Sequence, residues 1–199
     1  HAEREKQQRI RTSARTTEQR TSMIGETRLW RMPVTAHMPA FTRVKEIIAA
    51  GCGYNTNVNQ PFSGWVLNPD EDTRTLFRFT AMKRFPDLDI GSPEVTKTLD
   101  AMVRNNVAHE PTLGIHELGL TAVNGKRAPG TLDYFDHFPP AEQRQMKQAL
   151  FGTDSQAERD LYIGAQKKIV ETLTEMNRRG ILLIPGTDIG GAFTLHREL

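Results

Sequence analysis

The residues of this chain best suited to chemistry stand at or directly after runs that predict strands. They are His37 after residues 32–36, Asn57 or Asn59 within residues 54–59, His116 or Glu117 after residues 107–115, and Asp188 after residues 181–184. In α/β folds, the carboxyl ends of parallel strands form the edge where ligands bind and catalytic groups gather. Neutral imidazole and carboxylate are the ligands that zinc takes in catalytic sites with one position open for water. Such a metal lowers the pKa of its water to about 7, and a nearby carboxylate can then accept the proton.

Several of these side chains also have a purely structural interpretation. Asp, Gly and Thr are common in turns and caps, so the alternative for Asp188 is that it caps a following helix. His109 and His137 are expected on the surface or in loops. The single cysteine, Cys52, excludes an internal disulfide and any multi-cysteine zinc site, and we expect it to be a small buried residue.

The elements that would position the candidates alternate between strand and helix. Residues 181–184 are four aliphatics bounded by Gly180 and Pro185, which predicts a short strand buried on both faces, as in a parallel sheet. Residues 32–36 predict a strand, residues 41–50 a helix with Gly51 as its left-handed cap, and residues 54–59 a second strand. This order is that of a βαβ unit.

The remaining sequence predicts further helices and one more strand. Residues 61–91 are rich in Pro, Asp, Asn and Arg, and we expect them to form a long excursion outside the core. Ser92 and Pro93 predict a helix start, followed by a strand at residues 107–115. The apolar face of this helix would consist of Val95, Leu99, Met102 and Val103. Helices are also predicted at residues 140–150 and 155–179, and the longer one would turn inward Leu161, Ala165, Ile169, Leu173 and Met176.

Length and composition limit the class of protein. The chain has 199 residues, 37% of them hydrophobic and 25% charged, with a net charge of +2. One domain with a sizeable core is possible, but a complete eight-unit barrel needs about 250 residues. No run approaches the roughly 20 apolar residues of a membrane span. The cellular compartment stays open, because a signal peptide could have been removed or never have existed.

The N-terminal segment, residues 1–31, is distinctly basic and is predicted to be helical or irregular. It carries eight Arg or Lys against four Glu. Such a segment can bind nucleic acid or an anionic surface, and salt-dependent binding would be the sign of it. A solvated face or arm is the favoured interpretation, because the segment has no aromatic before Trp30 and lacks a zinc-finger or RNP-type pattern. We therefore expect no nucleic-acid partner.

Four blocks of residues carry a family resemblance over most of residues 30 to 199. They are PVTAHMPAFTRVKEIIAAGCGYNTNVNQPF, DTRTLFRFT, DIGSPEVTKTLDAMVRNNVAHEPTL and GILLIPGTDIGGAFTLHREL. In order and approximate spacing they resemble the metal-dependent amidohydrolase superfamily, in the branch related to imidazolonepropionase and the prolidase-like members. The last block is the most specific. The resemblance implies an α/β fold in which residues 32–199 are the second half of a (β/α)8 TIM-type barrel, roughly strands 5 to 8.

The resemblance also implies roles for individual residues. His37 matches a metal-binding histidine, and Asp188 matches an aspartate that binds metal and accepts the proton of the attacking water. His196 and Arg197 match a pair near the substrate pocket, where His116 is a further candidate. The family site holds one or two divalent metal ions, most often zinc. The implied activity is hydrolysis of an amide or other C–N bond in a non-ribosomal peptide, cyclic amide or dipeptide-like substrate.

The sequence departs from the family pattern at several positions. Asn57 stands where the family has a metal-binding histidine, and an amide is a poor zinc ligand. Arg11 stands nearest to a bridging lysine, and a guanidinium that stays protonated cannot bind metal. The first-strand His-x-His pair is absent. We therefore expect little or no activity from this chain alone, and the alternative is a degenerate relative that binds a ligand or a partner chain without hydrolysis.

A half-barrel has a further consequence for association. Its first and last strands would be open edges with apolar faces, which favours a homo-oligomer or a complementary chain. The substrate itself would be a small molecule or a peptide-like compound.

Overall fold

The computed structural model describes residues 10–12, 22, 24–26, 34–36, 44–68, 70–73, 75–127, 135–149, 153, 155–186 and 188. Four strands of three residues each form a parallel sheet in the order β1-β2-β3-β4. They are β1 (Ile10–Thr12), β2 (Val34–Ala36), β3 (Tyr54–Thr56) and β4 (Ala108–Glu110). The first strand lies in the predicted N-terminal segment and pairs with β2.

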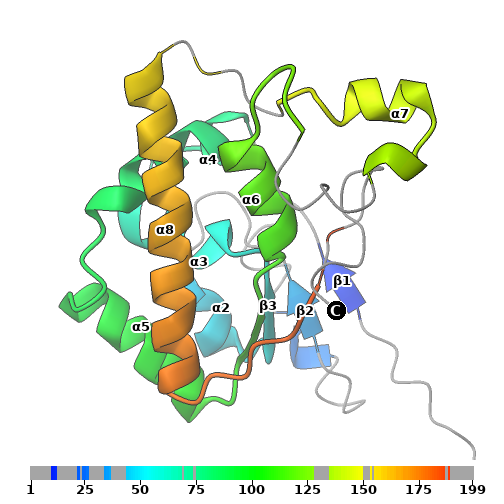
Figure 1. Ribbon diagram of the computed structural model, residues 1–199. Coiled ribbons are helices and arrows are strands. Elements are labelled where there is room, and N and C mark those ends of the chain that lie inside the picture. The colour runs from blue at the N-terminus through cyan, green and yellow to red at the C-terminus, as the bar shows by residue number, and fades with distance from the viewer. Residues whose placement is uncertain are drawn as a thin grey trace, which may run out of the picture.

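Helices make up most of the described chain (Figure 1). They are α2 (Val44–Ala50), α3 (Asn59–Val66), α4 (Phe77–Thr80), the 3-10 helix η1 (Ala81–Asp87), α5 (Pro93–Arg104), α6 (Leu113–Thr121), the 3-10 helix η2 (Phe135–His137), α7 (Pro140–Gln145) and α8 (Gln156–Arg178). The longest, α8, runs alongside α6 and also packs against η1. Among the described residues, no helix is both long enough and apolar enough to cross a membrane.

The predicted helix ends are confirmed where local chemistry defines them. The Ser92 hydroxyl accepts a hydrogen bond from the N–H of Val95 at the start of α5, with Pro93 in the first turn. The Ser155 hydroxyl accepts one from the N–H of Glu158 at 3.1 Å and so caps α8. Gly180 follows α8 with a φ of 82°, and the next N–H reaches back to a carbonyl of the last turn. Gly51 is the left-handed residue after α2, as predicted.

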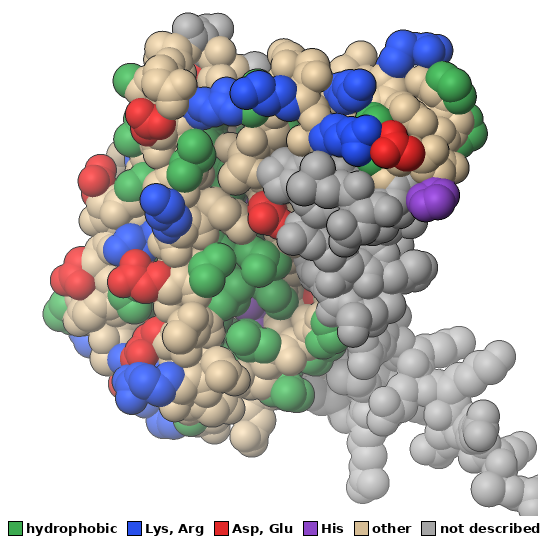
Figure 2. Space-filling model, in the orientation of Figure 1, with side chains coloured by type: hydrophobic (Ala, Val, Ile, Leu, Met, Phe, Trp, Pro, Cys, Tyr) green, Lys and Arg blue, Asp and Glu red, His purple; other side chains and the backbone are tan. Residues whose placement is uncertain are grey.

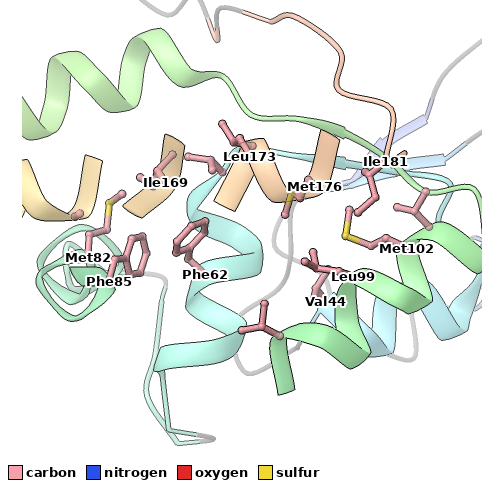
Figure 3. Packing of buried hydrophobic residues seen from close by; sticks show 14 of the residues in the cluster. Val44, Phe62, Met82, Phe85, Leu99, Met102, Ile169, Leu173, Met176 and Ile181 are labelled. Carbon is pink, nitrogen blue, oxygen red and sulfur yellow. The ribbon is translucent and has the colours of Figure 1, made fainter. Parts of the chain in front are cut away.

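The hydrophobic core lies between helices (Figure 3). Phe62 of α3 and Phe85 of η1 are both fully buried, with ring centroids 4.7 Å apart. Met82 of η1 and Ile169 of α8 lie close to this aromatic pair. Residues 61–91 therefore form part of the core, and the prediction of an excursion outside it is wrong. The hydrophobic spacing of these helices was masked by many polar residues around them.

The predicted faces of α5 and α8 are mostly confirmed. Val95, Leu99 and Met102 are buried on α5, whereas Val103 is 41% exposed. On α8 the four predicted residues from Ala165 to Met176 are buried, but Leu161 is 41% exposed and Tyr162 is buried in its place. The helical period is therefore right, and each face is rotated slightly from the prediction. Cys52 is buried, as expected.

The predicted fold class, an α/β half of a TIM-type barrel, is wrong. The described chain is mainly helical, and its strands are only three residues long. In a barrel, strand side chains fill the centre. Among the residues whose burial the structure describes, every member of the main hydrophobic cluster comes from a helix or a loop. Packing between α3, η1, α5 and α8 therefore replaces the strand-lined interior that the sequence pattern predicted.

The aliphatic run at residues 181–184 is not a strand buried on both faces. Ile181 is buried, but Leu182 is 64% exposed. The run meets β4 at a single bridge between His109 and Leu183, with backbone N–H···O distances of 2.9 Å on either side. Pro185 then has no N–H to continue the pairing. His109 is fully buried at this bridge, so the prediction that it lies on the surface is also wrong, whereas His137 is exposed as predicted.

Gly186 allows the chain to pass closely over the end of β4. A Cβ atom added at this residue would overlap the carboxylate and the Cγ of Glu110. We expect Gly186→Ala to lower the free energy of unfolding by about 1–3 kcal/mol, because the Glu110 side chain must move. Urea denaturation measures this cost. In a Glu110→Ala background the cost should largely disappear, and an undiminished cost there would contradict the explanation.

Candidate functional site

A cavity of about 340 Å³ opens between the start of α3, helices α4 and α6, η1 and the residue beyond the aliphatic run. Its polar lining comes from Asn57, Asn59, Gln60, Arg78, His116 and Asp188. Its apolar lining comes from Phe79, Met82, Ile115, Gly119 and Leu120. A hollow with an apolar wall and a few polar groups is the usual form of a small-molecule site.

Three of the predicted site residues meet in this cavity. Asn57 follows β3, His116 lies in α6, and Asp188 follows the aliphatic run, so positions up to 131 residues apart come together. His116 was predicted to follow a strand, but β4 ends at Glu110 and α6 carries the histidine. His37, His196 and Arg197 lie outside the described residues, as does the side chain of Arg11.

Asn57 and Asp188 are joined directly. The Nδ2 of Asn57 donates a hydrogen bond to the Oδ2 of Asp188 at 3.1 Å. Both residues have left-handed backbones, with φ values of 64° and 47°. The side-chain oxygens of Asn57 and Asn59 are buried, and no described residue donates a hydrogen bond to them. These two oxygens are therefore able to accept from a bound molecule or to bind a cation.

His116 is held in one tautomer by the loop before α6. Its Nδ1 lies 3.0 Å from the carbonyl oxygen of Thr112, and because that oxygen can only accept, Nδ1 carries the proton. The Nε2 atom of the neutral ring is then an acceptor. Thr112 itself has a φ of 47°, which is unusual for a β-branched residue.

Backbone strain gathers around the cavity. Four described non-glycine residues have positive φ, and three of them, Asn57, Thr112 and Asp188, line the cavity or hold His116. Each such conformation costs on the order of 1–3 kcal/mol and tends to persist at functional sites. Asn and Asp tolerate this conformation, so the clearest outlier is Thr112, the β-branched residue that holds His116.

Burial lowers the pKa of His116 below its ordinary value of 6.5, and the positive charge of Arg78 acts in the same direction. The Thr112 carbonyl and the negative charge of Asp188 oppose this shift but do not reverse it. The ring is therefore neutral at pH 7 and able to accept a proton or a hydrogen bond through Nε2.

The low pKa of His116 makes stability depend on pH. At pH values between the folded pKa of His116 and 6.5, the unfolded chain binds more protons than the folded chain. The contribution of His116 to the free energy of unfolding is therefore complete above pH 6.5 and is lost as the pH falls through this window. One proton limits the slope to about 1.4 kcal/mol per pH unit. We expect His116→Asn to flatten the pH dependence of unfolding in urea. A slope that persists in His116→Asn would assign the effect to another group.

The donors of the cavity suit a divalent cation. The Asp188 carboxylate and the His116 Nε2 are ordinary ligands, and the buried amide oxygens of Asn57 and Asn59 have no donor among the described residues. Within the part of the chain that the structure describes, no group of three or more His, Cys, Asp or Glu side chains could hold a metal. A complete site therefore needs the amide oxygens or a ligand from beyond the described residues.

Arg78 and Phe79 line the cavity, although the sequence predicted no role for either residue. They lie in a segment expected to be outside the core, and α4 is only four residues long. No local spacing marks them: α4 packs against η1, and η1 in turn packs against α8, so their place depends on contacts between distant segments.

A second hollow, of about 570 Å³, lies between α6, α8 and residues 183–185. It is lined by Pro111, Leu113, Gly114, Glu117, Gln166, Val170, Leu183, Ile184 and Pro185. Hydrophobic side chains gather near the centre of the face shown in Figure 2. We call this hollow the apolar groove.

Comparison of the chain with protein-family models, curated proteins and solved structures finds no match. The resemblance to amidohydrolases therefore rests on the sequence blocks alone.

Proposed function

We propose that this chain is a hydrolase that cleaves an amide or other C–N bond in a small molecule or peptide-like substrate. The observation that supports the proposal best is the meeting of Asp188, His116 and Asn57 in one partly apolar cavity. A carboxylate can accept and return a proton, a neutral imidazole can accept a hydrogen bond, and an amide can orient the carboxylate. The substrate would be a cyclic amide, a dipeptide-like compound or a non-ribosomal peptide.

In this proposal Asp188 is the proton acceptor. The oxygen of a water molecule bonds to the substrate carbonyl carbon while the water's proton passes to the Asp188 carboxylate. The C–N bond then breaks, and the same proton goes to the leaving nitrogen. The Nδ2 of Asn57, bound to Oδ2, orients the carboxylate so that its other oxygen faces the water. The Nε2 of His116 accepts a hydrogen bond from the substrate or the water.

The resemblance adds a divalent metal to this proposal, most often zinc. Asp188 and His116 would hold it together with the Asn57 amide oxygen, and His37 is the further ligand that the sequence predicts. When bound, such an ion polarises the substrate carbonyl and acidifies water. With or without this ion, Asp188 accepts the proton and Asn57 orients the Asp188 carboxylate.

The test is amine release from a panel of small N-acyl compounds, dipeptides and cyclic amides, assayed on the whole chain with and without added zinc. We expect slow release that disappears when the carboxylate of Asp188 is neutralised. No release from any compound, with or without metal, would refute the proposal.

A second candidate function is binding without hydrolysis. It is favoured by Asn57, because this amide stands where the resemblance implies a metal-binding histidine and an amide is a poor zinc ligand. A ligand that binds tightly but is recovered intact would support this candidate. The same class includes a partner chain, either a second copy or a complementary one, and the apolar groove with its 46% exposed Val170 is the surface that favours it.

A further inference from the structure

The consecutive helices α4 and η1 carry three basic side chains, and two of them have carboxylate partners. Lys83 pairs with Glu158 at 2.7 Å. Arg84 binds both oxygens of Glu71, at 2.7 and 2.8 Å. Arg78 lines the cavity and forms no salt bridge with any described residue. The positive charge at the cavity is therefore available to a ligand.

The aromatic ring next to Arg78 holds its guanidinium in place. The guanidinium carbon lies 4.6 Å from the centroid of the Phe79 ring, and Phe79 also lines the cavity. Stacking of this kind limits the motion of a long side chain while leaving its N–H groups free to donate. The flat guanidinium matches a carboxylate with two parallel hydrogen bonds.

The charges on the cavity are arranged with opposite signs. Arg78 and Asp188 both lie near enough to His116 to act on its charge, and they act in opposite directions. A molecule in the cavity thus meets a cation from α4, a carboxylate at residue 188 and an apolar wall. The wall consists of Phe79, Met82, Ile115 and Leu120. This lining favours a ligand with an apolar body and one negative group at the Arg78 side.

We propose that Arg78 binds a carboxylate of the ligand and so selects small apolar monoanions. That the bound molecule is a substrate whose C–N bond is cleaved rests on the proposed function. The binding of its carboxylate by Arg78 does not. Arg78 is a specificity residue in this proposal, because it holds the ligand at a group that does not react. Arg84 is its natural control, since it lies in the same region and its charge is already satisfied by Glu71.

The experiment uses two probes that contain no C–N bond, 3-phenylpropanoate and 3-phenylpropan-1-ol. Their dissociation constants are measured by NMR titration on the whole chain, above the ordinary histidine pKa of about 6.5. We expect the carboxylate to bind about tenfold tighter than the alcohol, because it forms charged hydrogen bonds with Arg78. The preference is no larger because Arg78 is exposed to solvent, which screens its charge. The ratio should fall to about one in Arg78→Gln, be partly kept in Arg78→Lys, and be unchanged in Arg84→Gln.

The outcomes separate this proposal from the proposed function. A ratio near one in the wild type, or no binding of either probe, overturns the role of Arg78. A preference that survives in Arg78→Gln overturns it too. A preference that depends on Arg78, in a chain that releases no amine from any amide, supports Arg78 while refuting hydrolysis.

Discussion

Replacing Asp188 with asparagine is expected to lower kcat/KM for amide hydrolysis by about 10²- to 10⁴-fold, the usual contribution of a proton acceptor. Asparagine has nearly the same shape and tolerates the left-handed backbone found at residue 188. Its side-chain oxygen can still accept from the Nδ2 of Asn57. The change therefore keeps the shape of the side chain and removes the proton acceptor together with its negative charge near His116. The measurement is the initial rate of amine release on the best substrate of the panel.

The control for this change is Asp70→Asn, at an exposed aspartate that does not line the cavity. It removes the same charge from the chain and should leave the rate within about twofold, as surface changes usually do. The loss in Asp188→Asn should appear in kcat more than in KM, because the proton moves only as the reaction proceeds. A variant that keeps wild-type kcat would rule out Asp188 as the proton acceptor.

Truncating Phe85 to alanine is expected to lower the free energy of unfolding by about 3–5 kcal/mol. The side chain is fully buried in η1, and its ring packs on Phe62 with an interplanar angle of 34°. The longest helix, α8, packs on η1, so the cavity left behind would lie between the two. Removal of the ring loses both apolar burial and the aromatic contact. Urea denaturation, with the midpoint and slope fitted separately, measures the change.

Leu76→Ala is the matched control, because Leu76 is 74% exposed at the start of α4, in the same region of the chain. Its effect should stay within about 0.5 kcal/mol. A loss of less than about 1 kcal/mol in Phe85→Ala would mean that residues 61–91 are not part of the core. The expectation from composition, that this segment forms an excursion outside the core, would then be correct.

The sequence by itself determined the helices whose ends are defined by local chemistry. Ser92 with Pro93, Ser155 and Gly180 act through hydrogen bonds and backbone angles within a few residues, so their effect is visible in the letters. The apolar period of α5 and α8 is local in the same way. Of the candidate site, Asn57 or Asn59, His116 and Asp188 could be predicted because each lies at or near the end of a run that predicts a strand.

Only the tertiary structure decided how these pieces pack. A run of four aliphatics at residues 181–184 is equally compatible with a buried strand and with an edge segment, and the exposure of Leu182 depends on what covers it. The burial of Phe62 against Phe85 and the arrival of Arg78 and His116 at one cavity depend on contacts between distant segments. Such contacts leave no periodic signal, because the residues that satisfy one another are not neighbours in the chain. The helical core and the lining of the cavity therefore follow from packing, whereas the helix ends follow from local bonding.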